Sequence, residues 1–94
     1  MDQSAVLVRS NDVTSENAAG EAIIIHMQSG TYFSLDEVGT VFWDRLDGTL
    51  TIAEHAEAIA KVYAAEVAEI ASDLVELAEG LVNEGLAREV GAAS

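Results

Sequence analysis

The spacing of apolar residues changes part-way along the chain, and this change limits the fold more than any other feature. Between residues 21 and 35 apolar side chains follow the two-residue period of strands. Beyond residue 36 they recur every three or four residues, as in amphipathic helices. Strands followed by helices predict the α+β class, here a three-stranded antiparallel sheet followed by a three-helix bundle.

The expected sheet has three strands. Residues 5–8 form a short first strand, and the small, polar residues 10–20 form a loop. The second strand is the β-branched segment 21–28, and Ser29-Gly30 makes a hairpin turn to the third strand, residues 31–35. Alternate side chains share a face of the sheet. The expected groups are Ile23 with Ile25 and Met27, Ile24 with His26, Phe33 with Leu35, and Tyr32 with Ser34.

Three helices are expected after the sheet. An aspartate can cap the first helix, a Thr-x-x-Glu capping box begins the second, and a glycine ends the third. A short wing strand then closes the domain. The residues that give these signals are Asp36, Thr51 with Glu54, and Gly85. The expected ranges are residues 36–47, 52–64 and 66–84 for the helices and 86–90 for the wing. This outline is that of a winged helix-turn-helix domain whose sheet comes first.

Length and composition predict one domain, residues 1–94, with an ordered core at about residues 5–90. Half of the residues are apolar, which is enough for one core. Cysteine is absent, which excludes disulfides, thiolate nucleophiles and cysteine-based metal sites. The chain shows neither a secretion signal nor an apolar run of membrane-spanning length. We therefore expect a cytoplasmic protein without a membrane partner.

The formal net charge of -13 limits the possible partners. Nucleic-acid binders attract phosphate with clustered lysine and arginine, and this chain has only four such residues against 17 acids. The expected third helix, residues 66–84, contains none of them, whereas a winged-helix regulator would need a basic recognition helix. No nucleic-acid partner is expected.

Motifs of known enzyme classes are also missing. The sequence contains no H-E-x-x-H, no G-x-S-x-G and no glycine-rich phosphate loop. His26 and His55 fall on different elements, and we expect both to be exposed or half-buried. The prediction is a protein that is not an enzyme and that uses no cofactor and no metal.

One ordered set of residues resembles a known family. A strand ending in Leu-Asp is followed by a small residue, an aromatic pair, a Leu-Asp-Gly and a threonine-capped helix. The matching positions are Leu35-Asp36, Gly39, Phe42-Trp43, Leu46-Asp47-Gly48, Thr51-Ile52-Ala53-Glu54, Tyr63, Asp73, Leu77 and Gly85-Leu86. Together they resemble the PqqD-like family of peptide-recognition elements over roughly residues 23–88. Phe42 departs from the commoner aliphatic residue, which affects the expected shape of the pocket.

The resemblance implies binding without catalysis. Family members hold the leader segment of a ribosomally made precursor peptide as an extra strand, in a groove completed by the third helix, and present it to a maturation enzyme. An exposed strand edge suits this role because its unpaired backbone groups can bond an extended peptide. The expected peptide-binding residues are Thr31, Tyr32, Phe33, Ser34 and Leu35 on the strand, and Val67, Ala71, Leu74, Val75 and Ala78 on the helix. Asp73 and Glu76 either form a solvated helix face or contact a basic residue of the leader.

Four aromatic residues lie close together in the sequence: Tyr32, Phe33, Phe42 and Trp43. All four can be core residues that join the sheet to helix one, and Tyr32 can instead stand beside the groove. Gly80 lies inside a helix, where glycine costs about 1 kcal/mol relative to alanine, so we expect it to permit a close approach.

The resemblance favours a leader-binding protein that works with a lasso peptide leader peptidase. The second choice is a PqqD-type chaperone for a radical SAM enzyme in quinone cofactor synthesis. Alternatives of another class are a winged-helix regulator and a structural subunit that dimerises through the same edge. A monomer or weak dimer is expected.

Overall fold

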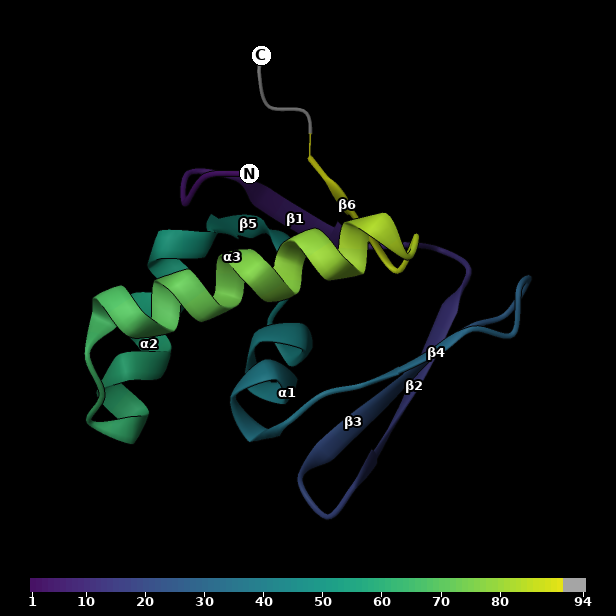
Figure 1. Ribbon diagram of the computed structural model, residues 1–94, viewed down its shortest axis with the longest axis horizontal. Coiled ribbons are helices and arrows are strands. Elements are labelled where there is room, and N and C mark those ends of the chain that lie inside the picture. Colours follow the sequence, from purple (N-terminus) through teal and green to yellow (C-terminus); the bar gives the residue numbers. More distant parts are fainter. Residues whose placement is uncertain (91–94) are drawn as a thin grey trace.

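Two three-stranded antiparallel sheets and three helices make up residues 1–90, the part of the chain that this computed structural model describes (Figure 1). The α+β class is confirmed. In chain order the elements are β1 (Val6–Arg9), β2 (Val13–Ala18), β3 (Glu21–His26), β4 (Tyr32–Ser34), α1 (Glu37–Asp44), β5 (Asp47–Thr51), α2 (Ile52–Tyr63), α3 (Val67–Asn83) and β6 (Ala87–Glu89).

The first sheet has the order β2-β3-β4, so the prediction of a loop at residues 10–20 was wrong. β2 lies within that segment and pairs with β3 along its whole length. The two strands are joined by Ala19 and Gly20, both with positive φ, the geometry that a tight two-residue hairpin turn requires. β2 is exposed along nearly all of its length. It therefore lacks the alternation of apolar and polar residues that identifies a strand in sequence.

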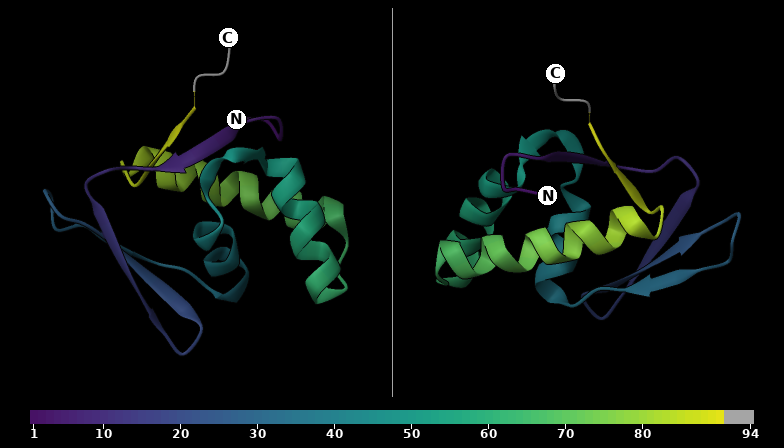
Figure 2. Two further views of the ribbon diagram at one scale, coloured as in Figure 1. Left: turned by 180° about the vertical axis from the view of Figure 1, so that it is seen from behind. Right: turned by 45° about the horizontal axis from the view of Figure 1, so that its top comes forward.

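The second sheet has the order β5-β1-β6. The expected first strand therefore pairs with β5 and β6, and its expected pairing with the strand at residues 21–28 was wrong. Asp47-Gly48 begins β5, whereas the sequence indicated only the end of helix one. The short C-terminal strand is confirmed as β6. Figure 2 shows the β2-β3-β4 sheet projecting from a body made of the helices and the second sheet.

The helix ends follow the capping signals. The Asp36 carboxylate accepts the Gly39 N–H at 2.8 Å and caps α1. The capping box at α2 is complete, because the Thr51 hydroxyl accepts the Glu54 N–H and the Glu54 carboxylate accepts the Thr51 N–H. α3 ends before Gly85, whose φ of 75° favours glycine. The second and third helices thus lie within one residue of the predicted ranges at each end.

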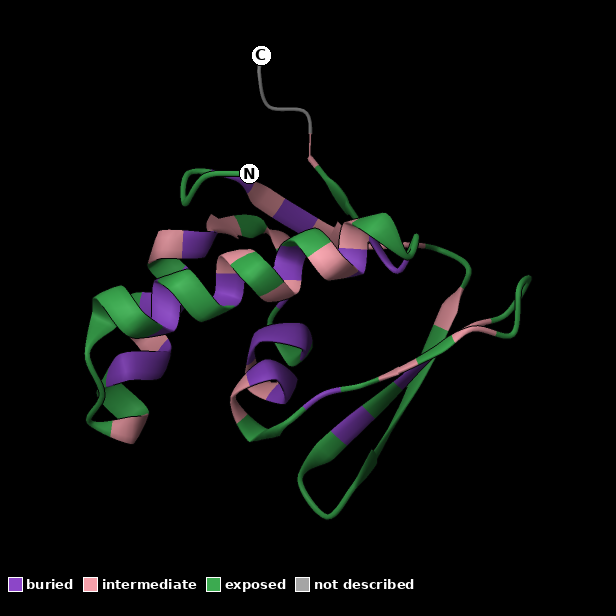
Figure 3. Ribbon diagram, in the orientation of Figure 1, coloured by how far each residue is buried: buried purple, intermediate pink, exposed green. Residues whose placement is uncertain are grey.

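The core lies where the three helices meet the inner faces of the two sheets (Figure 3). Phe42 and Trp43 are among its largest fully buried side chains, so their interpretation as core residues is confirmed. Trp43 also joins the two sheets. Its Nε1–H donates to the Ser15 hydroxyl of β2 at 3.2 Å, and the Arg9 guanidinium of β1 lies 5.3 Å from the Trp43 ring centroid.

Two polar residues in this core have different surroundings. The buried Thr40 hydroxyl accepts the Ala22 N–H at 2.8 Å and thereby ties α1 to β3. His55 is only 2% exposed, so the expectation of an exposed or half-buried histidine was wrong. The His55 ring packs edge-on against Phe42, with ring centroids 4.9 Å apart, and its Nδ1 atom has no hydrogen-bond partner among residues 1–90. The helical stripe that includes Ala56 and Ile59 turns His55 inward as well.

We expect the stability of the protein to fall as the pH drops below about 6.5, because of His55. Burial lowers the pKa of His55 from its usual value, nearby Arg45 lowers it further, and Asp47 opposes both. The unfolded chain then binds more protons than the folded chain below this pH, so acid favours unfolding, by about 1.4 kcal/mol for each pKa unit of lowering. Thermal melts at pH 7.5 and 5.5 measure this loss.

His55→Leu is the control for this pH dependence, because leucine does not titrate and the Nδ1 atom that it removes has no partner. The variant should lose less stability than the wild type between the two pH values. Equal losses in the two proteins would contradict the assignment to His55. Asp47 does not interfere in this range, because the Thr49 hydroxyl lowers the pKa of that carboxyl and its effect is lost only in stronger acid.

Candidate functional site

β4 is an edge strand, and its outward backbone groups are free. Within residues 1–90 it pairs with β3 alone. The Leu35 N–H donates to the Ala22 carbonyl at 2.9 Å, and the Thr31 carbonyl accepts the His26 N–H at 2.8 Å. Backbone groups of an antiparallel strand alternate in direction. The N–H and C=O groups of Tyr32 and Ser34 therefore point away from β3, toward the open edge.

A cavity of about 410 Å³ lies where β4 ends, between the start of α1 and α3. Apolar side chains form most of it, and two carboxylates and a hydroxyl add polar atoms. The lining residues are Ser34, Leu35, Asp36, Val38, Gly39, Ile70, Asp73, Leu74 and Leu77. We call the β4 edge together with this cavity the β4–α3 groove. An open strand edge beside an apolar cavity can bind an extended peptide through its backbone and through one of its side chains.

Gly39 allows α1 to lie close to α3 beside the groove. A Cβ atom at Gly39 would lie 3.2 Å from a Leu77 methyl carbon and 3.2 Å from the Asp36 carboxylate, so glycine permits this approach of α1 to α3. At Gly80 a Cβ atom would lie 3.7 Å from the tip of the Phe33 ring. This is an ordinary van der Waals distance, so the space at Gly80 does not require glycine, and the close approach expected there is not confirmed. Phe33 packs against the core as well as lying near α3.

The model of the family described as coenzyme PQQ synthesis protein D (PqqD) matches residues 21–87. This chain belongs to the PqqD family. A solved structure described as TbiB1 in complex with the TbiA(beta) leader peptide is 31% identical, with a TM-score of 0.76, over 93% of this chain and 99% of that one. Another, lasso peptide synthetase B1 complexed with the leader peptide, is 18% identical with a TM-score of 0.76, over 87% of this chain and 96% of that one. No curated protein matches.

In this PqqD-family chain the predicted strand residues lie along the open edge or just beneath it. Tyr32 is 69% exposed and Ser34 is exposed, on the face that the two-residue period assigned to them. Thr31 and Phe33 are half-buried, and Leu35 is buried, where it forms the end of the cavity. The Tyr32 side chain lies outside the core, in contrast to Phe33, Phe42 and Trp43.

The predicted helix residues are divided among three faces of α3. Leu74 and Asp73 line the cavity, as expected of groove residues. Ala71 and Ala78, predicted for the groove wall, are covered by the core and do not line the cavity. Val67 is 43% exposed at the start of the helix, and Glu76 is exposed; neither lines the cavity.

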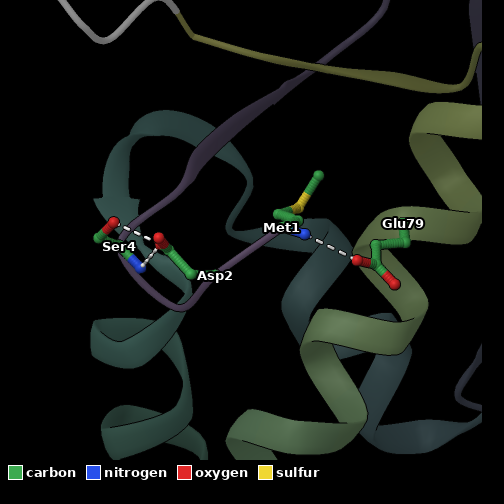
Figure 4. A network of polar contacts seen from close by, with 4 residues as sticks. All are labelled: Met1, Asp2, Ser4 and Glu79. Carbon is green, nitrogen blue, oxygen red and sulfur yellow. Dashed lines mark hydrogen bonds and ion pairs between the residues drawn. The ribbon is translucent and has the colours of Figure 1, made fainter.

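Val75, which was also predicted for the groove, lies on the opposite side of α3. It lines a shallow depression of about 440 Å³ together with Met1, Asp2, Gln3 and Ser72. The N-terminal segment is held there because the Met1 ammonium group lies 2.8 Å from the Glu79 carboxylate (Figure 4). This contact raises the pKa of the ammonium group. Hydrogen bonds from Ser4 to the Asp2 carboxylate close the turn that precedes β1 (Figure 4).

The sequence prediction omitted five residues that line the cavity: Asp36, Val38, Gly39, Ile70 and Leu77. A signal for two of them was present. Ile70, Leu74 and Leu77 recur at helical spacing and form one stripe of α3. The sequence could not show which side of this stripe faced the core and which faced the groove.

Within residues 1–90 no group of three or more His, Asp or Glu side chains is placed to hold a metal ion. None of the helices described there is both long enough and apolar enough to span a bilayer.

Proposed function

We propose that the protein binds the leader segment of a ribosomally made precursor peptide as an additional strand on β4. The observation that carries this proposal is the open β4 edge beside an apolar cavity, in a chain 31% identical to a protein solved with a leader peptide. A peptide strand would exchange hydrogen bonds with the outward N–H and C=O groups of Tyr32 and Ser34.

The cavity supplies the specificity in this proposal. Side chains of an added strand alternate in direction, so one side chain of the peptide can enter the space above Leu35, Leu74 and Leu77. Burying an aliphatic or aromatic side chain there contributes roughly 1.5–3 kcal/mol. Tyr32 offers its exposed ring and hydroxyl to a neighbouring peptide residue.

Carboxylates at the groove favour a leader that carries lysine or arginine. Asp73 and Asp36 line the cavity, and Glu76 lies farther out on α3. The protein carries a net charge of -13, which speeds the approach of a basic peptide. Rim charges of this kind change the association rate more than the affinity.

The bound leader is then delivered to a maturation enzyme, and this protein contributes binding rather than catalysis. A lasso peptide leader peptidase is the favoured enzyme, because both solved relatives are described with leader peptides and one is named a lasso peptide synthetase component. A radical SAM enzyme of quinone cofactor synthesis is the second choice, in keeping with the description of the family.

The same edge could instead pair with a second copy of the chain. Self-pairing brings two strongly acidic proteins together, so we expect it to be weak, and the protein to be a monomer or weak dimer. A winged-helix regulator fits less well. Described residues 67–83 form α3 without any lysine or arginine that could bind phosphate.

Amide NMR titration with the leader segment of the precursor encoded beside this gene tests the proposal. We expect saturable shifts at residues 32–35 of the strand and at Ile70, Leu74 and Leu77 of α3. A peptide of the same composition in scrambled order is the control. A folded spectrum that the leader leaves unchanged would contradict leader binding, and shifts confined to Met1 and Val75 would place the peptide on the wrong side of α3.

A further inference from the structure

The outer face of the β2-β3-β4 sheet carries an uncovered apolar row. Ile23 is 37% exposed, Met27 is 60% exposed, and Tyr32 is 69% exposed. These three make up half of the large exposed apolar residues in the described part of the chain. They belong to two neighbouring strands and the turn between them.

The strand register places these side chains on one face. Ile25 lies directly opposite Tyr32, and directly opposite residues of an antiparallel pair share a face. Ile23 and Met27 join them by the two-residue period of β3. The inner face is made by Ala22 and Ile24, which are buried. His26 turns inward too, because its Nε2 atom lies next to Gly85.

Carboxylates border this row on the β2 side. Glu16 lies directly opposite Ile23 in the register. The backbone N–H of Met27 donates to the carbonyl of Asp12, which puts Asp12 beside Met27. Asp12 and Glu16 are exposed to solvent, and residues 10–44 include no lysine or arginine. The result is an apolar row whose charged neighbours on the β2 side are all acidic.

We propose that this outer sheet face, defined by Ile23, Ile25, Met27 and Tyr32, docks a protein surface that presents apolar side chains bordered by lysine or arginine. Given the proposed function, on which this assignment rests, that surface belongs to the enzyme that processes the precursor. Removing the apolar row from water supplies affinity, and the acidic border selects a basic partner. A second copy of this chain is a poor occupant, because the two borders would repel each other.

The outer sheet face is continuous with the leader site. A peptide strand added to β4 extends the sheet next to Tyr32, and alternate peptide side chains then extend the same face. The processing enzyme can therefore contact the sheet and the peptide together. Affinity for the enzyme should accordingly be higher when the leader is bound.

This surface is tested by biolayer interferometry with the purified leader peptidase from the same gene cluster. Binding is measured with and without leader. The variant carries Ile23→Ser and Met27→Ser, which remove two exposed apolar side chains of the row without touching the buried face. We expect at least about tenfold weaker peptidase binding, a change that corresponds to 1.4 kcal/mol. Val62→Ser is the matched control, because Val62 is 64% exposed but lies at the far end of α2, and it should leave binding unchanged.

The charge border has its own test. Glu16→Lys should weaken peptidase binding and reduce its dependence on salt, whereas Glu57→Lys on α2 should do neither. Leader binding, followed in the same variants by NMR titration, should stay within twofold of the wild type. This readout separates the two proposals. If the wild-type protein binds the peptidase through this face but does not bind the leader, only the proposed function is contradicted.

Two results would overturn the outer sheet face as an enzyme dock. One is peptidase affinity that is the same for the wild type and the Ile23→Ser, Met27→Ser variant in the presence of leader. The other is a wild-type dimer in light scattering that becomes a monomer in this variant, since the face would then be covered by a second copy.

Discussion

Ser34→Pro is expected to weaken leader binding by roughly 30- to 1000-fold while the protein stays folded. The Ser34 N–H points to the open edge of β4, so proline removes a donor to the peptide and not a bond within the sheet. The binding free energy falls by about 2–4 kcal/mol, because one backbone hydrogen bond is lost and a peptide carbonyl is left unpaired. Isothermal titration calorimetry with the leader peptide measures the affinity.

Asn17→Pro is the matched control, on the opposite edge of the same sheet. The alternating pairing of β2 with β3 points the Asn17 N–H outward, and the side chain is exposed. This variant should bind the leader like the wild type. Circular dichroism checks that both proteins are folded. Equal affinities for the Ser34→Pro variant and the wild type would show that the peptide does not add to β4.

Phe42→Ala is expected to cost about 3–5 kcal/mol of folding free energy. Phe42 is completely buried and packs edge-on against His55, so alanine leaves a cavity at the centre of the core. A domain of this size is stabilised by only about 5–15 kcal/mol. The variant should therefore be partly unfolded at temperatures where the wild type is folded.

Urea unfolding followed by the fluorescence of Trp43, the one tryptophan of the chain, measures this loss. Phe42→Leu is the control, because leucine fills most of the space and should cost less than half as much. Because Phe42 does not line the β4–α3 groove, Phe42→Leu should also keep its affinity for the leader. A loss below about 1 kcal/mol for Phe42→Ala would show that the core is not packed around this ring.

Local sequence signals predicted the helical part of the fold. The caps at Asp36 and Thr51 and the stop at Gly85 act on backbone groups within four residues, so a sequence window contains all that is needed. β2 and β5 were not predicted, because no local sequence signal identifies them as strands. β2 is exposed on both faces, and β5 is specified by its pairing with β1, some forty residues away.

The strand side of the candidate site was predicted better than its helix side. The strand 31–35 and its faces followed from the two-residue period, and the structure adds that its outward edge is free. Of the α3 residues that were predicted, Leu74 and Asp73 line the cavity, whereas Ala71, Val75 and Ala78 lie on other faces of the helix. A stripe of apolar residues shows that a helix buries one side, but it does not show what each part of the stripe meets.

By itself, the sequence determined the α+β class, the capped helices, the alternating faces of β3 and β4, the acidic charge and the resemblance to the PqqD family. These properties depend on local periodicity, on composition, or on the order of short motifs. Only the tertiary structure decided the division into two sheets, the burial of His55, and the face of α3 that meets the open edge of β4. Each of these depends on contacts between residues far apart in the chain, which packing alone brings together.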